Sequence, residues 1–244
     1  LVSRRTLSTG QVYSWPGGCL GNVDSHALMG RGCKRWARHL WHGPSSSCAT
    51  SIILQNSGDN EMALLDTPLC DFGIPAPDFS LADPSGVVTS RDDAMGTNGL
   101  LIAFICNHCP YVLAVVERMV ADLKALQDKD IGVVAVMSND WSITPSDAPE
   151  NMAKFAQQHG FTFPYLVDET QSVGRAYGAV CTPDFFGYNA KGELQYRGRL
   201  DDARMGDAEN RTPELLTAML RIAQTGEGPR NQMPSMGCSI KWST

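Results

Sequence analysis

Two cysteines separated by two residues, in Cys106-Asn107-His108-Cys109, lie between two segments of different periodicity. Before them, Leu100 to Ile105 is a continuous apolar run, which predicts a strand buried on both faces. After them, apolar residues recur at the spacing of one helix face, at Val112, Val115, Val116, Met119, Val120, Leu123 and Leu126. The chain is therefore predicted to pass from a core strand into a helix, with the cysteine pair at the helix N-terminus.

A cysteine pair in that position is typical of disulfide exchange. The positive end of a helix dipole and its free N–H groups stabilise a thiolate, which is the reactive form of cysteine. Cys106 is therefore predicted to be the attacking nucleophile, and Cys109, about one turn later, to resolve the mixed disulfide. His108 is expected to favour the Cys106 thiolate, which would make the disulfide more oxidising than that of thioredoxin. Tyr111 is expected to cover one side of the site.

The same spacing also occurs in metal sites. Structural zinc requires a second pair of ligands at short spacing, and the remaining candidates, Cys181, His159 and Cys238, are isolated in the sequence. A copper or zinc carrier that uses the cysteine pair therefore stays open as an alternative. Disulfide exchange itself requires no metal and no organic cofactor.

The rest of the chain alternates strand and helix patterns, which indicates an α/β fold. A second apolar run, Ile131 to Met137, predicts another buried strand, and Pro149 begins a predicted helix. Further predicted elements are short strands at 79–81, 87–89 and 163–167, a helix at 170–177, a hairpin of 185–188 with 193–197, and a helix from about 213 to 223. The predicted order places the cysteine pair directly after the first core strand.

Thr182-Pro183 lies just before one of these apolar strands. Proline at the start of a strand indicates a sheet edge, a bulge or a cis peptide bond. A cis-Pro183 packed against the cysteines would leave its backbone free to pair with a partner chain in a mixed disulfide. Thr182, Asn107 and Tyr111 are therefore the predicted substrate contacts, and Pro183 joins the predicted catalytic residues Cys106, Cys109 and His108.

Several ordered motifs between Pro75 and Ala223 resemble the thioredoxin-like redoxin family, in its bacterial TlpA-like and AhpC/TSA-like branch. They are Pro75-Ala76-Pro77-Asp78-Phe79, the segment from Leu100 to Val112, Phe163 to Asp168, Ala176 to Val180, Thr182-Pro183 and Asn189 to Arg197. The resemblance implies a thioredoxin fold: a central mixed β-sheet flanked by helices, with an N-terminal β-hairpin and an αβ insertion from about Asp140 to Tyr177. It also implies that Pro183 is cis and lies beside the cysteine pair.

The sequence departs from the family pattern in two places. Thioredoxin itself has a tryptophan before the first cysteine and a buried acid six residues before it, where this chain has Ile105 and Leu100. Glu169 is the substitute proton acceptor proposed for Cys109. Peroxiredoxins have Pro and Thr before their reactive cysteine, where this chain has Gly99 and Ala103. Thiol peroxidase activity is therefore the less favoured enzymatic alternative.

Charge and sequence pattern predict where the domain begins and ends. Residues 1–61 carry six basic and three acidic residues and little periodicity, within a chain of net charge −6. They are predicted to be an unstructured or non-native extension upstream of Met62, followed by a thioredoxin-like domain at 62–227. The tail at 228–244 is expected to pack on that domain as coil, with Cys238 as a possible accessory resolving thiol and Cys181 as a small buried thiol.

The expected partners are protein or small-molecule disulfides and thiols. The acidic net charge argues against nucleic acid or an anionic membrane, and no apolar run approaches the roughly 18–20 residues of a membrane-spanning helix. Arg4-Arg5 lacks the apolar segment that follows in an export signal. A cytoplasmic location is therefore expected, with a periplasmic one if the true N-terminus differs. The sequence does not indicate an oligomeric state.

Overall fold

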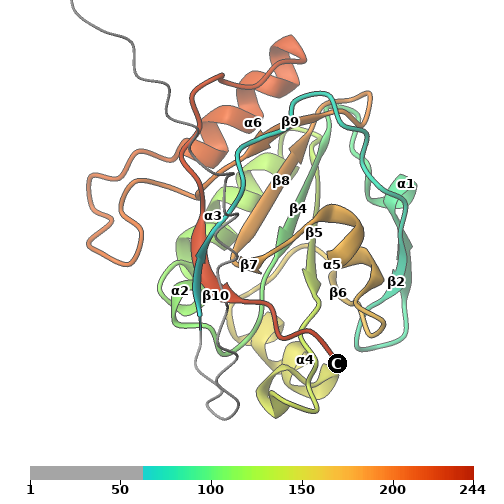
Figure 1. The fold of residues 1–244 in the computed structure, drawn as a ribbon. Helices are drawn as coiled ribbons and strands as arrows, with labels where there is room; N and C mark the ends of the chain where they lie inside the picture. Colours follow the sequence, from blue (N-terminus) through green and yellow to red (C-terminus); the bar gives the residue numbers. More distant parts are fainter. Residues whose placement is uncertain (1–62) are drawn as a thin grey trace, which may run out of the picture. The chain divides into compact units, whose positions relative to one another are not determined.

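A central β-sheet organises residues 63–244, the part of the chain that the computed structural model describes. Its five strands lie in the order β6-β5-β4-β8-β9. The first three strands run parallel, whereas β4–β8 and β8–β9 are antiparallel. The strand bounds are β4 Leu100–Phe104, β5 Gly132–Met137, β6 Tyr165–Val167, β8 Asp184–Tyr188 and β9 Leu194–Arg197. This mixed sheet with helices on both sides (Figure 1) is the predicted thioredoxin fold.

Alternation along β4 explains the two layers of helices. Leu101 and Ala103 pack into one core cluster, which includes residues of α3, α4 and α6, and Leu100 and Ile102 pack into the other, which includes residues of α5. Successive side chains of a strand point to opposite faces of the sheet. β4 therefore contributes to both clusters and is buried on both sides. The helix bounds are α1 Arg91–Ala94, α2 Pro110–Leu113, α3 Val116–Gln127, α4 Pro149–Gln158, α5 Ser172–Tyr177 and α6 Glu214–Thr225, with a 3₁₀ turn η1 at Pro145–Asp147.

The helix predicted from Val112 to Leu126 is interrupted in the structure. Its first part is α2, and α3 begins only at Val116. Between them the N–H of Val115 donates to the carbonyl of Val112, three residues back, at 3.0 Å. This tighter turn breaks the α-helical hydrogen-bond pattern while keeping the apolar residues on the buried face.

The tail expected as coil contains a strand. β10 (Met236–Ser239) lies between β1 (Leu64–Asp66) and β7 (Cys181–Thr182) and is antiparallel to both. Figure 1 shows β10 in red beside β1 in teal. A Cβ atom at Gly237 would lie 2.0 Å from the carbonyl oxygen of Thr182, so the close approach of the two strands requires glycine. This glycine weakens the apolar strand pattern of the tail.

The predicted N-terminal hairpin is present. β2 (Ser80–Ala82) pairs antiparallel with β3 (Val88–Ser90) as a separate two-stranded sheet. The predicted extension at 1–61 lies outside the described residues. Within 63–244, no helix combines the length and the hydrophobicity needed to cross a membrane.

Ion pairs with buried carboxylates connect the segment between β9 and α6 to α3. Arg118 Nε lies 2.6 Å from Asp201 Oδ2, and Arg211 Nη2 lies 2.6 Å from Asp122 Oδ1. Arg211 also approaches Asp201, with 3.4 Å between Nη1 and Oδ2. The side chain of Asp201 is 0% exposed, so its charge is balanced by arginines and not by water.

Candidate active site

The cysteine pair lies in the loop between β4 and α2. Cys106 follows β4 by two positions, and Cys109 is the N-cap of α2. The expectation that Cys106 lies at the helix N-terminus is therefore wrong, since Pro110 is the first helical residue and only Cys109 adjoins it. Both thiols are free and buried, with 1% and 0% exposure. Their environment is consequently set by side chains packed around the loop.

Thr182 contacts both cysteines. Its hydroxyl lies 3.3 Å from the sulfur of Cys106, and its carbonyl accepts a hydrogen bond from the Cys109 thiol at 3.1 Å. The Thr182–Pro183 peptide bond is cis. The prediction of a cis-Pro183 beside the cysteine pair is confirmed, because the same peptide unit supplies the carbonyl that Cys109 meets.

Asn107 is tied to a loop that sequence reasoning did not connect with the site. Its backbone N–H donates to Asp147 Oδ1 at 2.8 Å, and its side-chain amide donates to the carbonyl of Ser146 at 2.9 Å. The hydroxyl of Tyr165 donates to Asn107 Oδ1 at 3.1 Å. The contacts available to the Asn107 side chain are thus made within the protein, and they anchor η1 over the cysteine loop.

Asp147 is the functional candidate that the sequence analysis missed. Its side chain is 0% exposed, and Asn139 Nδ2 donates to its Oδ2 at 2.8 Å. His108 Nδ1 lies 2.8 Å from the same oxygen, although the ring nitrogen is not aligned for a linear hydrogen bond. The contact is therefore best described as an ion pair, and it raises the pKa of His108, with burial acting in the opposite direction.

The electrostatics of the two thiols are linked. Burial, followed by the interaction with Cys109 and the charge of Asp147, raises the pKa of Cys106. The two thiols therefore share their first ionisation, and the neighbouring dipoles determine which sulfur carries the negative charge.

An apolar hollow adjoins the cis proline. Its lining includes Tyr111, Val115, Pro183, Leu200 and Met236. Tyr111 is half-buried there, close to the position predicted for it at one side of the site.

The expectation for Glu169 differs from the structure. Glu169 is exposed and lines a different hollow, with Ser80 and Leu81 of β2, so the suggestion that it accepts the Cys109 proton is wrong.

Among residues 63–244, one group could hold a metal ion: ligand atoms of Cys106, His108 and Asp147 lie within 4.8 Å of one another. A thiolate, an imidazole and a carboxylate form a donor set that suits Zn²⁺.

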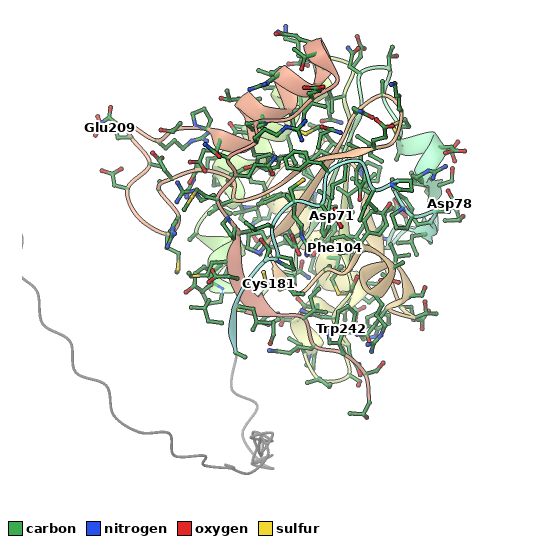
Figure 2. The ribbon with its side chains drawn as sticks, turned by 45° about the horizontal axis from the view of Figure 1, so that its top comes forward. Asp71, Asp78, Phe104, Cys181, Glu209 and Trp242 are labelled. Atoms are coloured by element: carbon green, nitrogen blue, oxygen red, sulfur yellow. The ribbon has the colours of Figure 1, made fainter. Side chains whose placement is uncertain are left out.

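The remaining buried cysteines differ in their neighbours. Cys181, labelled in Figure 2, lies in the interior beside β10, and its thiol faces the carbonyl of Pro183 at 3.8 Å. Burial raises its pKa, with the negative charge of Asp184 adding to the effect. Cys181 is thus a small buried thiol, as the sequence predicts.

Solved structures share this fold over most of the described domain. The chain is similar to an uncharacterized conserved protein from Geobacillus kaustophilus, at 40% identity and a TM-score of 0.71, over 75% of this chain and 98% of the other. It is also similar to the hypothetical protein SMc02350 from Sinorhizobium meliloti 1021, at 36% identity and a TM-score of 0.69, over 73% and 98% of the two chains.

Sequence comparisons name the family. The thioredoxin-like protein YneN of Bacillus subtilis is 32% identical over 126 residues, which are 50% of this chain and 68% of YneN. The family model described as AhpC/TSA family matches residues 72–197, a segment that includes the cysteine pair, η1 and the cis proline. With its thioredoxin fold and these relatives, the chain belongs to the thioredoxin-like AhpC/TSA family.

Proposed function

We propose that the protein is a thiol-disulfide oxidoreductase that exchanges disulfides through Cys106 and Cys109. The observation that supports this most directly is the position of Thr182, which contacts both sulfurs and precedes the cis proline. Two thiols that contact the same residue can close a disulfide, and the adjacent apolar hollow gives a partner chain an apolar surface beside Pro183. Protein or small-molecule disulfides and thiols are the proposed partners.

The dipoles of Thr182 support Cys106 as the nucleophile. A hydroxyl can donate a hydrogen bond to a thiolate, so the Thr182 hydroxyl favours negative charge on Cys106. A carbonyl oxygen repels an anion, so the Thr182 carbonyl favours the protonated form of Cys109.

The proposed reaction has two steps. The Cys106 thiolate attacks one sulfur of a substrate disulfide, forms a mixed disulfide and releases the other substrate sulfur as a thiolate. Cys109 then loses its proton and attacks the Cys106 sulfur, which closes the Cys106–Cys109 disulfide and releases the second substrate thiolate. The proton of Cys109 leaves to the departing thiolate or to solvent, and the direction of the reaction depends on the reduction potential of the pair.

Trapping tests the assignment. The Cys109→Ser variant, treated with oxidised glutathione, is expected to keep one glutathione on Cys106, detected by mass spectrometry of peptides and released by dithiothreitol. The wild type should lose the adduct as Cys109 resolves it, and the Cys106→Ser/Cys109→Ser variant should show no adduct at either position. A Cys109→Ser protein that leaves Cys106 unmodified would contradict the proposed mechanism.

A second candidate function rests on the three possible metal ligands. If the protein carries a metal on Cys106, His108 and Asp147, anaerobically purified protein should contain stoichiometric zinc or copper that is lost in the Cys106→Ser variant. Metal-free protein that still forms the glutathione adduct favours exchange. Peroxidase activity is separated from both by stopped-flow measurement of peroxide consumption by the reduced protein.

A further inference from the structure

A third cysteine lies beside the proposed pair. Cys238 of β10 is paired with Thr182 of β7 in the antiparallel register. Thr182 is the same residue that contacts Cys106 and Cys109 through its hydroxyl and its carbonyl. Cys238 is 4% exposed and belongs to the same packed cluster as both cysteines. Three thiols, from the cysteine loop and from a strand far along the chain, therefore meet around one residue.

Cys238 packs in the same buried cluster as Cys109, whereas Cys181 does not belong to that cluster. Burial, followed by the proximity of Cys109, raises the pKa of Cys238 to about 12. Cys181 has a different environment, since its thiol faces the carbonyl of Pro183. Cys181 and Cys238 are thus two buried thiols near the site, of which Cys238 packs in one cluster with Cys109 and Cys181 faces a backbone oxygen.

We propose that Cys238 is a third redox-active thiol, which forms a disulfide with Cys109. In the oxidised protein, Cys238 loses its proton and attacks the Cys109 sulfur of the Cys106–Cys109 disulfide. The Cys109–Cys238 bond forms, the Cys106–Cys109 bond breaks, and Cys106 leaves as a thiolate that can take up the proton. The step exchanges one internal disulfide for another, so it needs no external oxidant or reductant.

This exchange would leave Cys106 free while the protein remains oxidised. The Cys106 thiolate of the oxidised protein could then attack the disulfide of a second partner before the Cys109–Cys238 disulfide is reduced. The inference rests on the proposed function, because the Cys106–Cys109 disulfide is its starting point. Cys109 would take part in both disulfides, and it packs in one buried cluster with Cys106 and Cys238.

Disulfide mapping tests the third thiol in the full chain. The Cys106→Ser variant, oxidised with diamide, is expected to form an intramolecular Cys109–Cys238 disulfide, identified as a linked peptide that dithiothreitol separates. The matched variant Cys106→Ser/Cys181→Ser should keep this link, and Cys106→Ser/Cys238→Ser should lose it. A Cys106→Ser protein without the link, or with Cys109 linked to Cys181, would overturn the proposal. Cys106→Ala, in which position 106 carries no hydroxyl, provides a second background.

The wild type provides the second measurement. In diamide-oxidised wild type, alkylation with iodoacetamide should modify Cys106, and Cys238→Ser should reduce that modification by about tenfold, because the disulfide can then rest only on Cys106 and Cys109. Equal alkylation in both proteins would contradict the proposal. If the Cys106–Cys109 disulfide forms but Cys109–Cys238 does not, only the third thiol fails. If the Cys238→Ser variant never links Cys106 to Cys109, the proposed function fails.

Discussion

Asp147 and Asp201 are both carboxylates with 0% exposed side chains, but their partners differ in kind. Asp201 is paired with Arg118 at 2.6 Å and approached by Arg211 at 3.4 Å. Asp147 receives hydrogen bonds from two neutral amide groups, those of Asn107 and Asn139, and its ionisable partner is His108.

The difference indicates which carboxylate can take part in chemistry. A guanidinium group keeps its proton at every pH at which the protein is folded, so the charge around Asp201 is fixed. An imidazole titrates near neutral pH, so the net charge of the Asp147–His108 pair changes there. We therefore expect Asp201 to determine stability and Asp147 to determine the properties of the cysteines.

The largest expected effect is on stability, in Asp201→Asn. Removing the carboxylate leaves the partly buried Arg118 without its counter-charge, while Arg211 keeps Asp122. The loss should lower the free energy of unfolding by about 3 kcal/mol, measured by denaturant titration. The Cys106–Cys109 equilibrium with glutathione should stay within about twofold of the wild type, since the hydrogen-bond and ion-pair partners of Asp201 are arginines and not the cysteines. A stable variant with a shifted redox equilibrium would reverse the comparison.

The next effect is on redox equilibrium, in His108→Gln. Without the imidazolium, the charge of Asp147 is no longer balanced, and this charge already raises the pKa of Cys106. The ratio of disulfide to dithiol in glutathione buffers should therefore rise about tenfold, which corresponds to about 30 mV. Adding Asp147→Asn should bring the ratio back towards the wild type. A double variant that shifts as far as His108→Gln alone would show that Asp147 is not responsible.

A smaller, pH-dependent effect is expected for Asp147→Asn. The pKa of folded His108 is raised by Asp147, so the stabilisation from this pair is fully present below the ordinary histidine pKa and is lost as pH rises through the folded value. The variant should lose about 1 kcal/mol at about pH 5.5 and less at about pH 9. NMR titration should show a lower His108 pKa in the variant. Equal losses at both pH values would disconnect the two residues.

The smallest effect is expected at the more exposed pair of Arg199 and Glu214. Their Nε and Oε2 atoms lie 2.6 Å apart, and the side chains are 16% and 27% exposed. Glu214→Gln should cost less than about 1 kcal/mol, because such pairs gain little over hydration. A cost equal to that of Asp201→Asn would show that burial does not distinguish the ion pairs of this protein.

The sequence was sufficient to predict the parts of the fold in which one segment carries its own pattern. The apolar run at 100–105 identified β4, and the proline after Thr182 was correctly placed beside the cysteines. The apolar spacing predicted buried helical residues at 112–126 but not the break at Val115, since a single tight turn leaves the buried face unchanged.

The missed features depend on contacts between distant segments. Asp147 contacts Asn107 across 40 positions, from a loop in which no motif distinguishes it from other acids. β10 forms through pairing with β1 and β7, and its glycine lowers any strand signal in the tail. The cysteine at position 238 was a visible candidate, but its place beside Cys109 follows only from that pairing.

The position of β10 in the chain has a consequence for biosynthesis. Cys238 follows Cys109 by 129 positions (238 − 109). At a translation rate of about 5–20 residues per second, the ribosome adds that stretch in roughly 6–26 seconds. During this interval the nascent chain carries Cys106 and Cys109 without the strand that packs beside them. The order of synthesis therefore separates the appearance of the two thiols from the completion of their surroundings.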